Sequence, residues 1–239
     1  MRNEIQFKVY GRMALFTDPI TKLGGEKSSY PIPTYQAMKG IVESIYWKPT
    51  IIWIIDEMRV INEICTQSRG IRPVKYSEGG NDLSIYKYLS NVCYEVKAHF
   101  IFNMHRPDLA ADRNENKHHN IAKRMVERGG RRDIYLGTRE CLGYVEPVEY
   151  GKTSGFYDET GSIPFGTMYH GMNYADETGK PTLQVRLWQP VMNHGIVKFL
   201  TPDECTLVRD VRPVISKHFD KNNVTFVDQE FENMKGGIL

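Results

Sequence analysis

Three neighbouring side chains, Lys117, His118 and His119, could carry out acid–base chemistry on a phosphate ester. Lysine supplies a fixed positive charge, and histidine titrates near neutral pH. Cleavage of RNA by its own 2′-hydroxyl needs such groups. One accepts the hydroxyl proton, one stabilises the extra negative charge on the phosphate, and one protonates the leaving 5′-oxygen. This chemistry requires no metal ion.

Each of these residues also has a purely structural interpretation. In a helix, His118 would lie close to the apolar face formed by Ala122 and Met125, and could be a hydrogen-bonded histidine at the edge of the core. Tyr46 continues the Val42 face of an earlier predicted helix, where packing is the more common role. Composition alone does not choose between catalysis and packing.

The lysine and the two histidines fall in the first turn of a predicted helix. Asp112 or Asn114 could cap its start, because short polar side chains accept hydrogen bonds from the first helical N–H groups. Gly129 and Gly130 then end the helix. The apolar residues recur at helical spacing and should face the core: Ile121, Ala122, Met125 and Val126.

The same helix carries a basic stripe. Lys117, Arg124 and Arg128 align along it, and Arg131 and Arg132 follow the glycine pair. These side chains could contact phosphates or form an ordinary solvated helix face. Charge is also uneven along the chain, because residues 1–145 carry 22 basic and 16 acidic side chains and the remainder carries 9 and 13. We therefore expect a polyanion to lie mostly against the first part.

The overall composition is that of an ordinary globular protein, with 41% hydrophobic residues and a net charge of +2. No stretch has the length of a membrane span and no signal-peptide core is visible, so we expect a cytoplasmic protein that does not bind membranes. The cysteines lack the close pairing of zinc or redox motifs and should be free thiols: Cys65, Cys93, Cys141 and Cys205.

Motifs for metals and nucleotides are absent from the sequence. The other histidines show no ligand spacing: His99, His105, His170, His194 and His218. Walker A, dinucleotide-binding and nucleophile-elbow motifs are missing as well. We expect no cofactor.

Residues 1–145 show the pattern of one α+β domain. A strand around residues 5–9 precedes a helix with Thr34 as N-cap, which ends before Pro49. A β-branched run from Ile51, a basic hairpin or loop insertion over 65–90, and an alternating strand over 92–102 follow. With the basic helix and one more strand, the order is βαββαβ, a ferredoxin-like (RRM-like) arrangement. Such a fold serves several RNA-binding modules, but fold alone does not assign function.

Residues 146–239 show short strand candidates separated by Gly, Asp, Asn and Pro, and no helical pattern. We expect a small antiparallel β domain there. Its polar tail after Asp220 should be partly disordered.

Several motifs in one order resemble a known family. They are Phe16-Thr-Asp-Pro, Gly24-Gly-Glu-Lys-x-Ser-Tyr30, Glu43-Ser-Ile-Tyr-Trp-Lys-Pro49, His105-Arg-Pro-Asp-Leu-Ala, Lys117-His118, Gly129-Gly-Arg-Arg-Asp-Ile, Leu136-Gly-x-Arg-Glu-Cys141 and Val185-Arg-Leu-Trp188. The chain is thereby similar to the precursor CRISPR RNA endoribonucleases of type I-C systems, the Cas five-d family of the RAMP superfamily. The resemblance spans nearly the whole chain.

The resemblance implies a ferredoxin-like domain with a β-hairpin insertion and metal-independent cleavage of precursor CRISPR RNA. Cleavage would fall within each repeat, at the 3′ base of its hairpin, and would leave a 2′,3′-cyclic phosphate and a 5′-hydroxyl. The protein would keep the 5′ handle of the mature RNA within the type I-C interference complex, beside other subunits. Incidental DNA binding stays open.

The family's catalytic residues map onto Tyr46, Lys117 and His118. We expect His118 to transfer protons, Lys117 to stabilise the phosphate charge, and Tyr46 to orient or help deprotonate the 2′-hydroxyl. His119 keeps open a swap of roles between the histidines. The residues expected to bind RNA are Lys27, Arg69, Arg124, Arg128, Arg131, Arg132 and Arg139.

Two alternative functions follow from the same residues. A non-catalytic subunit could grip the RNA handle while another protein cuts it, and the basic stripe suits that function equally well. A metal-dependent nuclease would need clustered carboxylates, which the sequence does not offer.

Overall fold

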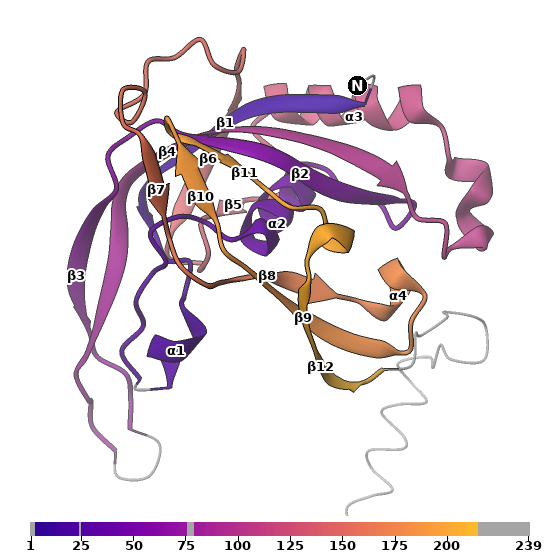
Figure 1. Cartoon of the computed structure of the whole chain (residues 1–239). Coiled ribbons are helices and arrows are strands. Elements are labelled where there is room, and N and C mark those ends of the chain that lie inside the picture. The colour runs from indigo at the N-terminus through magenta and orange to yellow at the C-terminus, as the bar shows by residue number, and fades with distance from the viewer. Residues whose placement is uncertain (1–2, 24, 76–78, 215–239) are drawn as a thin grey trace, which may run out of the picture.

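The computed structural model describes residues 3–23, 25–75 and 79–214 of the chain (Figure 1). The strands are β1 (Glu4–Ala14), β2 (Ile51–Val60), β3 (Cys65–Ile71), β4 (Ser84–Phe102), β5 (Ile134–Tyr135), β6 (Leu142–Pro147), β7 (Ser162–Pro164), β8 (Met168–Asn173), β9 (Thr182–Trp188), β10 (Val191–Asn193), β11 (Ile196–Lys198) and β12 (Leu207–Pro213). The helices are α1 (Pro19–Lys22), α2 (Tyr35–Ile45), α3 (Glu115–Glu127) and α4 (Ala175–Thr178), with short 3-10 helices η1 (Pro107–Asp112) and η2 (Pro202–Glu204). None of the helices in these ranges is long and apolar enough to span a membrane.

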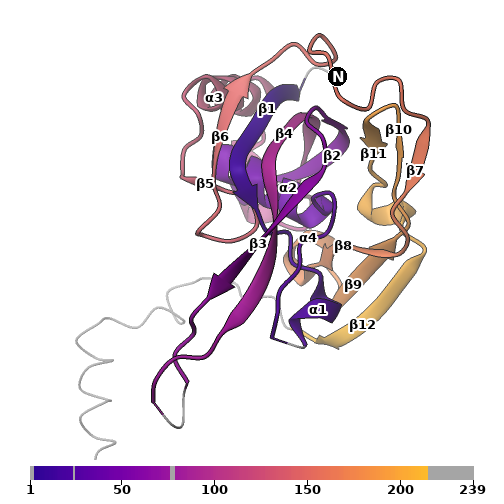
Figure 2. The same ribbon diagram turned by 90° about the vertical axis from the view of Figure 1, so that its left-hand side faces the viewer.

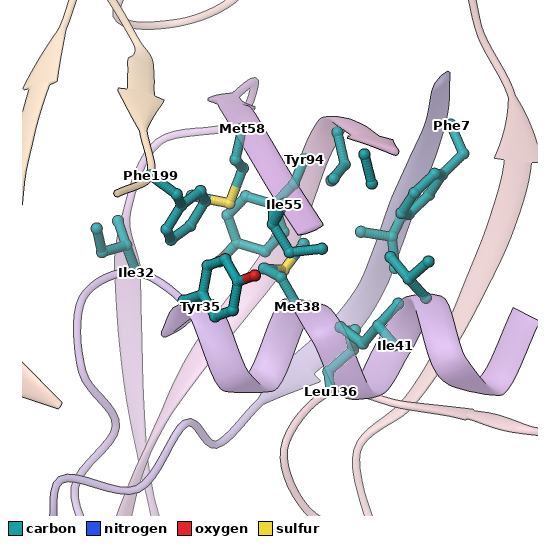
Figure 3. Packing of buried hydrophobic residues seen from close by; sticks show 14 of the residues in the cluster. Phe7, Ile32, Tyr35, Met38, Ile41, Ile55, Met58, Tyr94, Leu136 and Phe199 are labelled. Atoms are coloured by element: carbon teal, nitrogen blue, oxygen red, sulfur yellow. The ribbon is translucent and has the colours of Figure 1, made fainter. Parts of the chain in front are cut away.

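The fold is α+β and mostly antiparallel, as the sequence predicts. The large sheet has the order β5-β6-β1-β4-β2-β11-β10-β7, and β3 pairs with the first part of β4, from Ser84 to Ser90. Both longer helices, α2 and α3, lie against the same face of this sheet (Figure 2). The hydrophobic core forms between these helices and the sheet. Figure 3 shows Phe7 of β1, Met58 of β2 and Tyr94 of β4 within it.

Helix α2 forms where the sequence predicts it. The side chain of Thr34 accepts a hydrogen bond from the N–H of Ala37 at 3.1 Å, which confirms the expected N-cap. The apolar residues Met38, Val42 and Ile45 are fully buried. Helical geometry stops at Ile45, and Tyr46 is extended, with φ −158°. The chain therefore leaves the helix with the Tyr46 side chain turned into the protein, where it is 2% exposed.

Strand β4 is longer than the sequence predicts. Its second part, from Val92 to Phe100, buries every second side chain as expected, although Glu95 on the other face is buried as well. Its first part, from Ser84, pairs with β3 and forms a two-stranded arm that projects from the sheet (Figure 2). This arm is the predicted insertion over 65–90. The sequence did not predict one continuous strand because the exposed arm buries too little apolar surface to show alternation.

Helix α3 is also confirmed, with both of its ends. Asn114, one of the two expected caps, accepts a hydrogen bond from the N–H of Lys117 at 3.0 Å. Gly129 and Gly130 follow the helix with φ of +85° and +111°, a region that glycine occupies without steric penalty. The buried face is Ala122 and Val126, together with His118.

The strands after residue 146 divide between two sheets. Strands β7, β10 and β11 extend the large sheet, since β11 pairs with β2, while β8, β9 and β12 form a separate antiparallel sheet. The domain division between residues 145 and 146 stays a prediction. Helix α4 shows that helical structure does occur after Glu146, and a four-residue helix is too short to leave a periodic pattern. The tail expected after Asp220 lies outside the described residues.

The smaller sheet and helix α4 contact the first turns of α2. The ring of Tyr35 stacks on that of His170 with 4.3 Å between centroids, and Lys39 bonds to Glu177 at 2.7 Å. Nε2 of His170 donates to the carbonyl of Leu200, and its Nδ1 accepts from Arg186. Burial, followed by the charge of Arg186, lowers the pKa of His170 to about 4. The imidazole is therefore neutral at pH 7.

Candidate active site

Tyr46 and His118 meet inside the protein although 72 positions separate them. The phenol oxygen of Tyr46 lies 2.7 Å from Nδ1 of His118. Tyr46 comes from the end of α2, and its own carbonyl accepts a hydrogen bond from the indole N–H of Trp53 at 2.7 Å, which fixes the backbone there. The rings of Phe100 and Phe102 approach His118 edge-on, at 6.0 and 6.3 Å between centroids.

The hydrogen bonds of His118 define its tautomer. Nε2 lies 2.8 Å from the backbone carbonyl of Asp112, and a carbonyl oxygen can only accept. Nε2 must therefore carry a hydrogen. In the neutral ring Nδ1 is then the acceptor, so the hydroxyl of Tyr46 donates to it. These two hydrogen bonds fix the ring so that Nδ1, its proton-accepting nitrogen, faces the hydroxyl of Tyr46.

The electrostatics agree with this direction of the hydrogen bond. Burial, and after it the negative charge of Asp112, raises the pKa of Tyr46, while Arg131 lowers it. The phenol is therefore protonated at neutral pH. Tyr46 can pass a proton to His118 only if it receives one in exchange, as a relay does.

Lys117 lies next to this pair and is half exposed. Its ammonium group forms an ion pair with the carboxylate of Asp112. The hydroxyl of Thr50 donates to the other oxygen of the same carboxylate at 2.8 Å. The hydrogen bond from Lys117, followed by that from Thr50, lowers the pKa of Asp112. Asp112 thus contacts both residues: its carboxylate pairs with Lys117 and lies 3.5 Å from Nε2 of His118, and its backbone carbonyl accepts the hydrogen bond from that nitrogen.

Asp112 and Thr50 are site residues that the sequence analysis missed. The sequence pattern indicates only a possible helix cap at Asp112 and gives no signal for Thr50. An acidic residue five positions before Lys117 was the only available signal, and such spacing is common by chance.

His118 and His119 have different hydrogen-bond partners. Nε2 of His119 lies 3.0 Å from the carbonyl of Glu4 on β1, so His119 faces the N-terminal strand rather than Tyr46. Successive residues on a helix point about 100° apart, which directs His118 into the core and His119 along the sheet edge. The structure groups Tyr46, Lys117 and His118, and leaves His119 outside.

A basic turn adjoins the site. The backbone N–H groups of Arg131 and Arg132 donate to the carbonyls of Ile45 and Ser44, both at 3.1 Å. This docks the turn against the last residues of α2, directly before Tyr46. The side chains of both arginines are exposed.

The other basic residues spread over a larger surface. Arg124 and Arg128 are exposed on α3, and Arg139 is exposed in the turn before β6. Arg69 lies on the β3–β4 arm, and the ammonium of Lys27 is 5.1 Å from the ring centroid of Tyr86 on the same arm. The seven residues expected to bind RNA therefore do not form one cluster. In the described parts of the chain, no group of three His, Cys, Asp or Glu side chains could hold a metal ion.

Comparisons with known proteins identify the family of this chain. A family model described as CRISPR-associated protein (Cas_Cas5) matches residues 4–200. The chain belongs to the Cas5d family. A Cas5d relative from Thermus thermophilus, named CRISPR pre-crRNA endoribonuclease, is 26% identical over 189 residues, which are 75% of this chain and 77% of the relative. A relative of the same name from Mannheimia succiniciproducens is 28% identical over 156 residues, covering 54% of this chain and 65% of the relative.

A solved structure supports the same membership. The structure, described as that of a CRISPR-associated protein, is 38% identical to this Cas5d chain, with a TM-score of 0.73. The match covers 86% of this chain and 96% of the other. The fold of the described residues is thus one that Cas proteins adopt.

Proposed function

We propose that this Cas5d chain is a metal-independent endoribonuclease that cleaves precursor CRISPR RNA within the repeat, at the 3′ base of its hairpin. The protein then keeps the 5′ handle as a subunit of a type I-C interference complex. One observation supports the chemistry above all others, namely the 2.7 Å contact between the Tyr46 hydroxyl and Nδ1 of His118, with Lys117 adjacent. The names of the two relatives support the substrate.

The hydrogen bonds suggest how the proton moves. The 2′-hydroxyl donates to the phenol oxygen of Tyr46, which passes its own proton to Nδ1 of His118. The 2′-oxygen attacks the phosphorus, and the ammonium of Lys117 stabilises the negative charge that develops on the phosphate. The 5′-oxygen leaves and takes the proton from Nε2 of His118, so the ring is again neutral, with its hydrogen now on Nδ1. The products are a 2′,3′-cyclic phosphate and a 5′-hydroxyl.

Substrate must first gain access to this pair, because Tyr46 and His118 are 2% and 0% exposed. In the proposed mechanism a phosphate replaces the carboxylate of Asp112 on Lys117. Both groups are anionic oxygen acceptors, so one can substitute for the other. Movement of Asp112 would also release its carbonyl from Nε2 of His118. Opening the site and freeing the ammonium of Lys117 for the phosphate are then a single event.

The architecture is consistent with a ferredoxin-like unit. The strands β1, β2, β4 and β6 have the spatial order β6-β1-β4-β2, and α2 and α3 connect them in the sequence βαββαβ. We assign residues 1–145 to this unit and the β3–β4 arm to its insertion. Residues 146–239 would form the second unit, although β7, β10 and β11 pair with the first sheet.

Cleavage of a repeat RNA by purified protein in EDTA tests the proposal. We expect cut RNA, and we expect no cleavage when the scissile position carries a 2′-deoxy sugar. Lys117→Ala and His118→Ala should each abolish cleavage, while His119→Ala should retain it because His119 bonds to Glu4 instead. Cleavage that appears only with added magnesium would contradict the metal-free mechanism.

A second function deserves the same test, that of a non-catalytic subunit that binds the RNA handle. The complete burial of His118, with both ring nitrogens bonded, favours it, since that is also the environment of a structural histidine. Binding of repeat RNA without cleavage under all conditions would decide for this function.

A further inference from the structure

A pair of tyrosines lies on the face of the large sheet opposite the core. Tyr10 on β1 and Tyr144 on β6 are direct partners in the antiparallel register. Their neighbours Val9 and Val145 point into the core, so strand alternation turns both tyrosines outward. The ring centroids are 5.7 Å apart and the planes are tilted by 34°. Tyr144 is 53% exposed, which is unusual for so large an aromatic side chain.

Three hollows in the surface adjoin at Tyr144. The first lies between Tyr10, Tyr144 and the turn from Arg128 to Ile134. The second lies between Tyr144, Arg12 and Arg69, toward the β3–β4 arm. The third lies over Tyr10 and Arg12 and reaches Asn62 and Asn91. Tyr144 lines all three, so one trough runs from the basic turn, over the tyrosines, to the base of the arm.

Basic side chains border this trough at both ends. Five arginines line it: Arg12, Arg69, Arg128, Arg131 and Arg132. Within the described residues none of them forms an ion pair. Glu146, by contrast, is bonded to Lys8 at 2.8 Å and to the hydroxyl of Tyr10, and these bonds lower its pKa. Asp133 and Glu140 also line the trough, so two carboxylates stand against the five arginines and the net charge is positive.

An exposed aromatic ring, that of Tyr144, between unpaired arginines suits single-stranded nucleic acid. Every base offers a flat face that can stack on tyrosine, and the phosphates between bases bind arginine. A double helix would keep its bases stacked on one another and could not use the rings. An apolar protein partner would leave the five arginines without counter-charges.

One end of the trough adjoins the chain segment that carries Tyr46. Arg131 and Arg132, at one end, are hydrogen-bonded through their backbone to Ile45 and Ser44, the two residues before Tyr46. We propose that the trough binds the single-stranded RNA that adjoins the cleavage site, with one base stacked on Tyr144 and its phosphates on Arg12 and the basic turn. The inference rests on the proposed function, because it assumes that the substrate is RNA.

Binding of two uncleavable RNAs tests this inference. Both carry a 2′-deoxy sugar at the scissile position of the repeat hairpin, and only one has single-stranded flanks. We expect Tyr144→Leu to weaken binding of the flanked RNA by about 5- to 150-fold, the effect of one lost base stack. Binding of the bare hairpin should stay within about twofold. Tyr144→Phe should bind like the wild type, because stacking needs only the ring.

Two controls separate stacking from other effects. Tyr174→Leu removes a tyrosine that is 39% exposed beside the smaller sheet and should leave RNA binding unchanged. Arg12→Gln should lower the slope of log Kd against log salt by about 0.7, the value for one phosphate on a single strand, whereas Tyr144→Leu should not change that slope. Thermal melting of each variant shows whether it is folded.

The outcomes distinguish this inference from the proposed function. If the wild type binds and cuts RNA while Tyr144→Leu binds the flanked RNA equally well, the stacking site is wrong and the function stands. If Tyr144→Leu weakens both RNAs equally, the ring contacts the hairpin and the single-strand assignment is wrong. If the wild type binds neither RNA, the proposed function itself is refuted.

Discussion

Replacing Tyr46 by phenylalanine removes one oxygen atom and isolates the contact on which the proposed chemistry depends. The aromatic ring stays, so no large cavity forms between α2 and α3. Nδ1 of His118, which is fully buried, is left without a hydrogen-bond partner. The variant therefore tests the stability of the fold and the cleavage rate through the same atom.

The expected effects have different sizes. An unsatisfied buried acceptor costs about 1–3 kcal/mol, so the free energy of unfolding should fall by that amount. Loss of a positioned proton-transfer group lowers rates by about 10²- to 10⁴-fold. We expect the single-turnover cleavage rate at saturating protein to drop within this range, while the affinity for uncleavable repeat RNA changes little.

Urea unfolding and single-turnover cleavage measure the two effects separately. Tyr35→Phe is the matched control, because Tyr35 is equally buried at the opposite end of α2, and its hydroxyl makes only a 3.4 Å bond to the carbonyl of Trp53. That variant should cleave at the wild-type rate. A Tyr46→Phe protein that loses stability but cuts RNA at the wild-type rate would show that the Tyr46–His118 pair is structural, and the catalytic assignment would be refuted.

Three further predictions concern charge, pH and backbone geometry. Asp112→Asn should tighten binding of uncleavable repeat RNA by about fivefold at low salt, because the carboxylate on Lys117 no longer competes with a phosphate. Equal Kd values for the variant and the wild type at low salt would contradict this. The pKa of His170 is about 4 in the folded state and about 6.5 when unfolded, so the unfolded chain binds more protons between these values. The neutral His170 therefore contributes up to about 3 kcal/mol to the free energy of unfolding above pH 6.5, and this contribution should be lost as the pH falls to 4. Urea unfolding of His170→Gln should show a smaller loss of stability over the same pH range. Gly137→Ala should lower the free energy of unfolding by more than about 2 kcal/mol, and Tm should fall with it. The reason is that φ is +98° and the new Cβ would lie 2.0 Å from the carbonyl oxygen of Leu15. An unchanged Tm would show that this turn rearranges freely.

Several features of the protein follow from the sequence alone, because neighbouring residues decide them. The N-caps Thr34 and Asn114 act on N–H groups three positions away, and Gly129 ends α3 through its own backbone freedom. The alternating face of β4 from Val92 likewise depends on a local period of two. Helical periodicity also placed His118 beside Ala122, on the buried side.

Tertiary packing alone decided the composition of the site. The contact between Tyr46 and His118 joins the end of α2 to the start of α3, and it forms only when both helices pack on one face of the sheet. Asp112 became a site residue because η1 brings its carbonyl to His118 and its carboxylate to Lys117. Tyr144 faces Tyr10 through strand register, which residues 134 positions apart cannot specify locally. Sequence pattern thus determined which side chains are available, and the fold determined which of them can act together.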